Sequence, residues 1–155
     1  FLVSETVTRM NQGARLDDIV HEVQLDPSIL EKPYLQPIYD EPEFVVRNIW
    51  RMYGGWYDGN PAHLKPAPEA ELARELTQLA GGSLPLAERA HSLAETNPRL
   101  ACHLVEFAVQ ADPDNKDLHE IRVQVYQARR GLESSLMAKG IYGSAANESR
   151  EKLAE

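Results

Sequence analysis

Apolar residues recur every three or four positions through the second half of the chain, which is the spacing of one helix face. The runs that share this spacing are Leu72, Leu76 and Leu79; Leu86, Ala90 and Leu93; Ala101, Leu104, Ala108 and Ala111; and Leu118, Ile121, Val125 and Ala128. No segment alternates with a two-residue period for any length, so little or no sheet is expected. The pattern predicts an all-α fold.

Helix-breaking residues separate these runs. Pro68 begins the first helix and Gly81-Gly82 ends it. Asn97 is a good N-cap, Pro98 suits the first helical turn, and the sequence ADPDN at 111–115 forms a further turn with a fresh cap. These signals place three short connections between four helices.

The last part of the chain is predicted to hold two helices. The stripe that starts at Leu118 is expected to continue past Gly131 through Leu132 and Leu136 and to close at Lys139-Gly140. Ser144 is then expected to cap a final helix.

Residues 86–115 resemble a tetratricopeptide hairpin. The segment reads LAERAHSLAETNPRLACHLVEFAVQADPDN, with small residues where two helices would cross and a proline after the second helix. Only one convincing unit is present, whereas a repeat array needs about three. The sequence therefore predicts TPR-like antiparallel hairpins inside a larger helical domain.

The first 68 residues are less regular. A short amphipathic helix is expected around Leu16, Ile19, Val20 and Val23, followed by an extended, Pro-rich segment from Pro27 to Pro42. A D-x-x-E capping box of Asp40 and Glu43 is predicted to start the next helix. That helix carries Val46, Ile49, Trp50 and Tyr53 and ends at Gly54-Gly55.

An aromatic turn follows that helix and has no counterpart elsewhere in the chain. Its sequence, RMYGGWYDGNPAHLKPAP, spans residues 51–68. The aromatic residues fit either a buried structural corner or the centre of a protein interface. The candidate interface or anchor residues are Trp50, Tyr53, Trp56, Tyr57, Asp58 and Asn60.

Composition and charge narrow the classes of function. The 155 residues are 43% hydrophobic and 26% charged, and the formal net charge is −8. An acidic surface without a stripe of Lys or Arg disfavours binding to nucleic acid. No apolar run is long enough to span a membrane. The single Cys102 forms no internal disulfide and is predicted to be a small core residue.

The sequence shows no local signature of catalysis. The five histidines have none of the short spacings of zinc motifs and are expected to be solvated or capping residues. No nucleophile elbow, phosphate-binding loop or dinucleotide-binding turn is present. Alone, the chain is therefore predicted to bind no zinc and to be catalytically inactive.

The motif GWYDGNP, residues 55–61, closely resembles the dimerisation domain of metallo-β-lactamase-fold alkyl sulfatases. The segments NQGARLDDIV, LAGG and ARRGLESSLMAKGIYGSAA agree, so the likeness spans nearly the whole chain. The resemblance implies a parent hydrolase of alkyl sulfate esters whose preceding catalytic domain binds zinc through H-x-H-x-D-H and further ligands. Family members often have Ser-His-Asn, near the sulfate, where this chain has Glu43, Phe44 and Val45.

The resemblance also implies how the chain is organised. Residues 1–40 would be a tail from the preceding catalytic domain, 41–143 the helical dimerisation domain, and 144–155 the start of a linker helix to a further C-terminal domain. The leading hypothesis is a homodimerising assembly domain, with no cofactor of its own, whose zinc and alkyl sulfate-like substrate belong to the full-length parent. The alternative is a TPR-like adaptor that binds a peptide. A soluble protein is expected, with the cytoplasm and the periplasm both left open.

Overall fold

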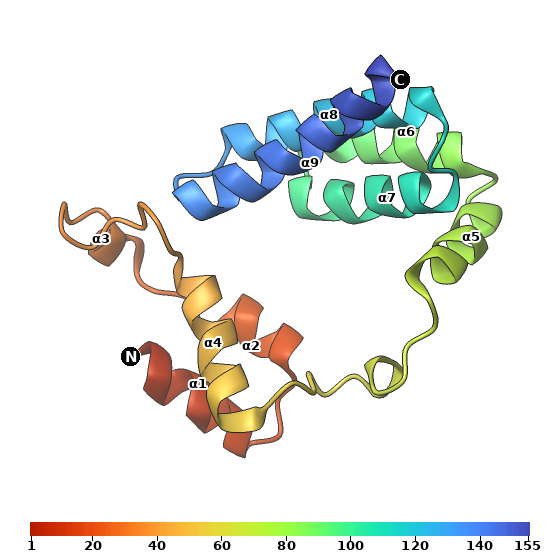
Figure 1. Cartoon of the computed structure of the whole chain (residues 1–155). Helices are drawn as coiled ribbons and strands as arrows, with labels where there is room; N and C mark the ends of the chain where they lie inside the picture. Colours follow the sequence, from red (N-terminus) through yellow and green to blue (C-terminus); the bar gives the residue numbers. More distant parts are fainter. The chain divides into compact units, whose positions relative to one another are not determined.

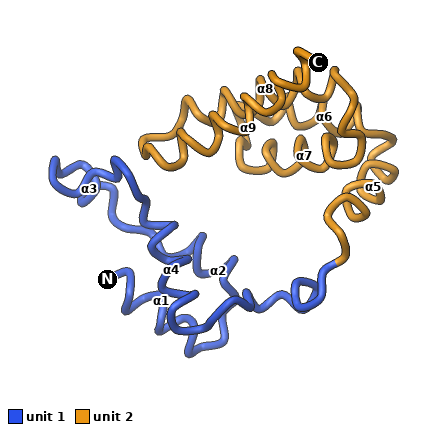
Figure 2. Tube along the Cα trace, in the orientation of Figure 1, with its two compact units in different colours: residues 1–66 blue, residues 67–155 orange.

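The computed structural model describes residues 1–155 and contains nine α-helices, one short 3-10 helix and no strand. The all-α prediction is confirmed. Contacts divide the chain into two compact units, residues 1–66 and residues 67–155 (Figure 2). The domain boundaries expected after residues 40 and 143 follow from the family resemblance and stay predictions.

The first unit is a small cluster of helices around α4. Its elements are α1 (Leu2–Asn11), α2 (Leu16–Glu22), α3 (Pro27–Leu30), α4 (Pro42–Gly54) and η1 (Pro61–His63). Helices α1 and α2 both pack against α4. The core consists of large side chains: Ile19, Val20, Val23, Val46 and Trp50. Their helical spacing in α2 and α4 places all of them on faces that meet.

The second unit is a stack of helical hairpins. Its elements are α5 (Glu69–Leu79), α6 (Ser83–Leu93), α7 (Pro98–Ala111), α8 (Lys116–Gly131) and α9 (Leu136–Ala154). Helix α6 packs on α7, α7 on α8 and α8 on α9, whereas α5 packs mainly on α7 (Figure 1). The predicted antiparallel hairpins are therefore present.

Alanine dominates the crossings of these helices. Ala90, Ala101 and Ala146 are fully buried in one cluster, and Ala87 and Ala108 are fully buried in a second. Small side chains let neighbouring helices approach closely, which places larger residues around each crossing. The rings of Tyr126 on α8 and Tyr142 on α9, for example, stack with their centroids 5.8 Å apart.

The predicted helix ends in this unit are largely confirmed. The side chain of Asn97 accepts a hydrogen bond from the Leu100 N–H at 3.3 Å, and that of Asn115 accepts from the Asp117 N–H at 3.1 Å. Gly81 has φ of +87°, in the left-handed region where glycine ends helices without strain. Local chemistry therefore determines these connections.

The predicted boundary near residue 140 is wrong. Helix α8 ends at Gly131, and α9 runs through Gly140 and Ser144 without interruption. The cap is Ser135, whose hydroxyl accepts a hydrogen bond from the Ala138 N–H at 3.2 Å. An interior glycine costs only about 1 kcal/mol, which the packing of α9 on α8 offsets.

Two further expectations for the first unit are also wrong. The capping box of Asp40 and Glu43 does not form, because α4 begins one residue later than expected, with Glu41 at its N-cap. The Asp40 carboxylate instead accepts from the adjacent Glu41 N–H at 2.8 Å. The Pro-rich segment, expected to be extended, is interrupted by α3, a single turn capped by Asp26. Helix α1 has no counterpart among the expected helices.

Two more sequence-based expectations concern the membrane and the thiol. No helix is both long and apolar enough to cross a membrane. Cys102 lies partly buried against the alanine-rich cluster that includes Ala101 and Val105. Burial raises the pKa of the Cys102 thiol to about 11, so the thiol stays protonated near neutral pH.

Candidate functional site

Trp50, the first of the predicted anchor residues, connects the core of the first unit to the aromatic turn. Its side chain is buried in α4, and the indole Nε1–H donates a hydrogen bond to the backbone carbonyl of Tyr57 at 3.1 Å. A tryptophan combines a large apolar surface with one polar donor. Trp50 thus fills the core and fixes the return of the chain after Gly55.

The turn depends on two glycines and on contact with the start of α2. Gly55 and Gly59 have φ of +82° and +92°, which side-chain-bearing residues rarely adopt. A Cβ on Gly59 would lie 3.4 Å from the Arg15 Cα, and the Leu16 N–H donates to the Asp58 carbonyl at 3.1 Å. The chain therefore lies directly against the N-terminus of α2.

Asp58 and Asn60 hold the turn together through hydrogen bonds. The Asp58 carboxylate accepts from the Asn60 N–H at 2.9 Å and lies 2.5 Å from the His63 Nδ1. The Asn60 side chain accepts from the Ala62 N–H at 3.1 Å and caps η1. The hydrogen bond from His63, followed by that from the Asn60 N–H, lowers the pKa of Asp58.

Two of the candidate residues point away from this framework. Trp56 is 73% exposed and Tyr53 is 62% exposed, beside Met52. Trp56 meets Tyr57 edge to face, with ring centroids 6.0 Å apart. The six candidates therefore separate into a buried residue (Trp50), a hydrogen-bonded turn (Tyr57, Asp58, Asn60) and two exposed aromatic residues (Tyr53, Trp56). A role in association stays a prediction.

A hollow of about 300 Å³ lies beside the turn, within the first unit. Its lining combines Arg15 and Arg47 with the carboxylates of Asp17, Asp18 and Asp58. His63 also lines it, but no serine, threonine or cysteine does, so its pair with Asp58 has no nucleophile there to activate. Nowhere in the chain do three His, Cys, Asp or Glu side chains converge as metal ligands.

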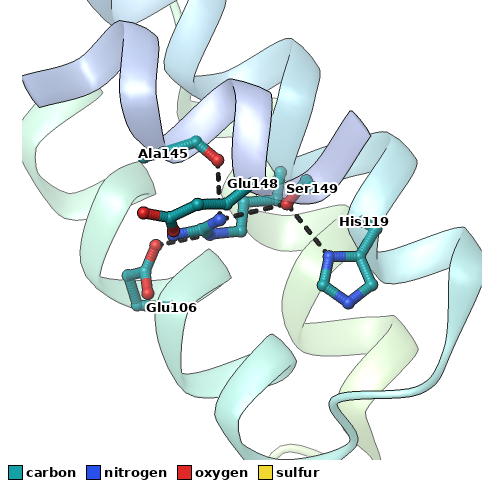
Figure 3. Close-up of polar contacts among 6 residues, drawn as sticks. Glu106, His119, Ala145, Glu148 and Ser149 are labelled. Atoms are coloured by element: carbon teal, nitrogen blue, oxygen red, sulfur yellow. Dashed lines mark hydrogen bonds and ion pairs between the residues drawn. The ribbon is translucent and has the colours of Figure 1, made fainter. Parts of the chain in front are cut away.

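The second unit contains a buried polar cluster centred on Arg122 of α8, which joins α7, α8 and α9 (Figure 3). The guanidinium donates to Glu106 of α7 at 2.7 Å and to the Ala145 carbonyl of α9 at 2.7 Å. It also donates to the Ser149 hydroxyl at 3.0 Å and pairs with Glu148 at 3.4 Å. One side chain thus links three helices.

Electrostatics favour the charged form of Arg122. Burial alone would lower its pKa, but the hydrogen bond and charge of Glu106 outweigh burial and raise the pKa. The guanidinium also lies over the Tyr126 ring, 5.2 Å from its centroid. A buried charge with this many partners is a structural link rather than a reactive group.

His119 belongs to the same cluster and corrects the expectation that all histidines are solvated or capping. It is only 6% exposed, with Nε2 at 2.8 Å from the Pro113 carbonyl and Nδ1 at 3.0 Å from the Ser149 hydroxyl. A carbonyl can only accept, so Nε2 carries a proton and donates to Pro113. The sequence signal missed was that Arg122 follows the core residue Leu118 by four positions, on the same face of α8.

Comparison with known proteins identifies close likenesses. A family model described as alkyl sulfatase dimerisation matches residues 15–152. A linear primary-alkylsulfatase of Pseudomonas sp. (strain ATCC 19151) is 30% identical over 99% of this chain and 29% of its own length. An (R)-specific secondary-alkylsulfatase of Pseudomonas sp. is 29% identical over 97% of this chain and 23% of its own length. The chain therefore spans less than a third of these relatives.

Solved structures agree with the sequence relatives. The stereoselective inverting sec-alkylsulfatase Pisa1 from Pseudomonas sp. matches with a TM-score of 0.87 and 27% identity, over 98% of this chain and 24% of that one. A double mutant of the same sec-alkyl sulfatase matches with a TM-score of 0.88 and 28% identity, over the same shares of the two chains. The helical architecture described above is therefore that of a segment of these enzymes.

Proposed function

Since the chain belongs to the alkyl sulfatase dimerisation family, we propose that it is the assembly region of a larger hydrolase that cleaves sulfate esters. The observation that carries the proposal is the family match over residues 15–152, which includes most of both compact units. The relatives that share this stretch are named as alkylsulfatases. The alternative of a TPR-like adaptor is not favoured, because the match extends well beyond the single TPR-like hairpin.

The substrate class proposed for the parent protein is an alkyl sulfate ester. Zinc is proposed to act in a catalytic region that lies outside these 155 residues. The chain's own histidines and carboxylates do not fit a zinc site, since no three of them converge. No step of the reaction is therefore assigned to residues of this chain.

The proposed assembly is a two-fold homodimer, the commonest closed arrangement of identical subunits. Exposed apolar side chains support it, because such residues are enriched where proteins meet. In the first unit these are Met52, Tyr53 and Trp56, and in the second unit Leu132, Leu136 and Ile141 are 59–63% exposed. The exposed residues Tyr53 and Trp56 are the part of the predicted anchor set proposed to contact the partner subunit or the adjoining catalytic region.

Analytical ultracentrifugation tests the assembly. At tens of micromolar we expect a species of twice the 17.4 kDa chain mass. Trp56→Ala is expected to weaken association by about 2 kcal/mol if this residue lies at the centre of the interface. A chain that stays monomeric over the whole concentration range contradicts the proposed homodimer.

The proposed activity is tested on the longer protein. We expect sulfate release from a linear alkyl sulfate by the full-length protein, its loss on chelation of zinc, and no release by the 155-residue chain alone. A full-length protein that dimerises but releases no sulfate from alkyl esters would contradict the proposed reaction while leaving the assembly role in place.

A further inference from the structure

A basic groove lies between α8 and α9, on the surface of the second unit. It has a volume of about 340 Å³. Its lining includes Gln127, Arg130, Lys139, Gly143, Asn147 and Arg150. The residues from α9 are spaced by three or four positions, so they share one helix face, and that face lies against the C-terminal half of α8. The groove is therefore built by the packing of two regular helices.

The charge of this groove differs from that of the rest of the chain. Arg130, Lys139 and Arg150 supply three positive charges, and no carboxylate is among the lining residues. The whole chain has 24 acidic and 16 basic residues, with a formal net charge of −8. Several arginines elsewhere pair with carboxylates, as Arg122 does with Glu106. The three cations of the groove therefore form a locally positive patch on an acidic chain.

Neutral amides hold Arg150 in place. Its guanidinium donates to the Asn147 side-chain oxygen at 2.7 Å. In the amide orientation that satisfies both groups, the Gln127 oxygen accepts from the same guanidinium at 2.9 and 3.2 Å. An amide oxygen fixes the position of a guanidinium without cancelling its charge. Arg150 is thus positioned, and its charge remains available to a ligand.

Gly143 makes room for Arg130. A Cβ at this position would lie 3.3 Å from the Arg130 Nε and 3.6 Å from its Cδ, so the arginine passes directly over the glycine. Glycine is a poor residue for a helix interior. An alanine at this position would require the Arg130 side chain to shift by a few tenths of an ångström from its path across the groove.

We propose that this groove binds a tetrahedral oxyanion, a sulfate or phosphate group, either free or as the headgroup of a monoester. Guanidinium groups match the oxygens of such anions in both charge and hydrogen-bond geometry. The volume accommodates the anion with either water or a short organic substituent. Binding at this surface does not depend on the proposed hydrolysis, so the two proposals fail separately.

Nuclear magnetic resonance of the 155-residue chain tests the proposal. Sodium sulfate and sodium phosphate are titrated at constant ionic strength against sodium chloride. We expect saturable shifts confined to the backbone amides around Gly140, Gly143 and Ser144 and to the Arg130 and Arg150 Nε–H signals. Half-saturation is expected at about millimolar concentration or below.

Three variants make the test specific to the groove. Arg130→Gln is expected to weaken binding about tenfold, because it removes one of three charges. Arg89→Gln is the matched control, since this exposed arginine of α6 bonds only to Ser92 and its own helix, and binding should be unchanged. Gly143→Ala keeps every charge and improves helix propensity. It should weaken binding by displacing Arg130 while raising the melting temperature, so unfolding cannot explain the loss.

Methyl sulfate and methyl phosphate distinguish the two sources of the anion. Binding as tight as that of the free ions indicates an ester headgroup, and weaker binding indicates the free ion. Linear, non-saturating shifts that are equal in all variants would indicate non-specific anion effects and overturn the proposal. The absence of anion-dependent shifts would also overturn the proposal. A change in sedimentation caused by Arg130→Gln would then indicate that the groove is a protein contact.

Discussion

The two units of the chain are stabilised in different ways. The first unit buries a few large side chains, such as Ile19, Val46 and Trp50, and leaves other aromatic residues exposed. The second buries alanines where helices cross and adds a charged cluster around Arg122. The first depends on filling space with large groups, whereas the second depends on the close approach of helices and on the hydrogen bonds around Arg122. Both are all-helical, so helix content alone does not reveal this difference.

The stabilities of the two units can be measured separately because both tryptophans lie in the first unit. Trp50 and Trp56 are the only tryptophans in the chain. Their emission therefore reports on the first unit alone. Far-UV circular dichroism reports mainly on the second unit, which contains the longest helices, α8 and α9. Following both signals during unfolding separates effects on the two units.

The largest expected effect comes from Arg122→Ala. It leaves the Ala145 carbonyl and the buried Ser149 hydroxyl without their donor and removes the partner of Glu106. Breaking a buried ion pair by removing one partner costs about 3–5 kcal/mol. We expect the dichroism melting temperature to fall by about 12 °C or more.

Arg89→Ala is the control for this change. Arg89 is exposed and is expected to alter stability by no more than about 0.5 kcal/mol. Similar melting temperatures for Arg122→Ala and Arg89→Ala would mean that the charged cluster contributes little, and the distinction between the two units would then fail.

Trp50→Ala is expected to have the next largest effect, in the first unit. The change removes a buried ring and leaves the Tyr57 carbonyl without its donor. We expect a loss of about 3 kcal/mol, the lower end of the range for large aromatic residues, because the ring is 9% exposed. Hydrogen exchange of the α4 backbone amides, followed by nuclear magnetic resonance, measures this loss.

Trp56→Ala is the matched control, the same substitution six residues later. Trp56 is 73% exposed, so at concentrations low enough to keep the chain monomeric its removal should change the free energy of unfolding by no more than about 0.5 kcal/mol. Equal losses of unfolding free energy for Trp50→Ala and Trp56→Ala would contradict the exposure of Trp56.

Ala101→Leu should have a smaller effect, in the second unit. Ala101 is fully buried in α7, where a larger side chain would force the neighbouring helices apart. Overpacking of this kind costs about 1–3 kcal/mol. Chemical denaturation followed by circular dichroism should show the loss, with the tryptophan signal less affected. A neutral result would indicate a loosely packed crossing.

The smallest expected effect concerns Asp58→Asn and depends on pH. The pKa of Asp58 is lowered in the fold, chiefly by the hydrogen bond from His63. The charged carboxylate therefore contributes stability above the ordinary aspartate pKa of 3.8, and this contribution is lost as the pH falls through the folded value. The parent chain should be more stable than the variant at neutral pH, and the difference should shrink only as the pH falls from about 3.8 through the folded pKa of Asp58. A difference independent of pH would exclude a role for the charge.

The sequence predicted the second unit well wherever a local signal marked a helix end. Asn97, Asn115 and Gly81-Gly82 were interpreted correctly because capping depends on neighbouring residues. The boundary at Ser135 was missed, since Gly140 looked like a stronger stop than a serine. Tertiary packing of α9 overrides that preference, and packing cannot be inferred from a single helix.

The candidate site was only partly predictable. Composition marked the aromatic turn as unusual, but it could not separate buried Trp50 from exposed Trp56, six residues away. The Arg122 cluster was missed entirely. Its members, including Glu106, His119 and Ser149, lie on three helices, and only the folded chain brings them together.

The order of helix contacts also has a consequence for folding rate. In the second unit α6 packs on α7, α7 on α8 and α8 on α9, each pair adjacent along the chain. In the first unit α1 packs on α4 across about thirty intervening residues. Closing a longer loop costs more entropy before any contact compensates for it, and domains rich in local contacts fold faster. The hairpins of the second unit should therefore form sooner than the α1–α4 contact. When the complete chain refolds from denaturant, the second unit should fold before the first has closed its core.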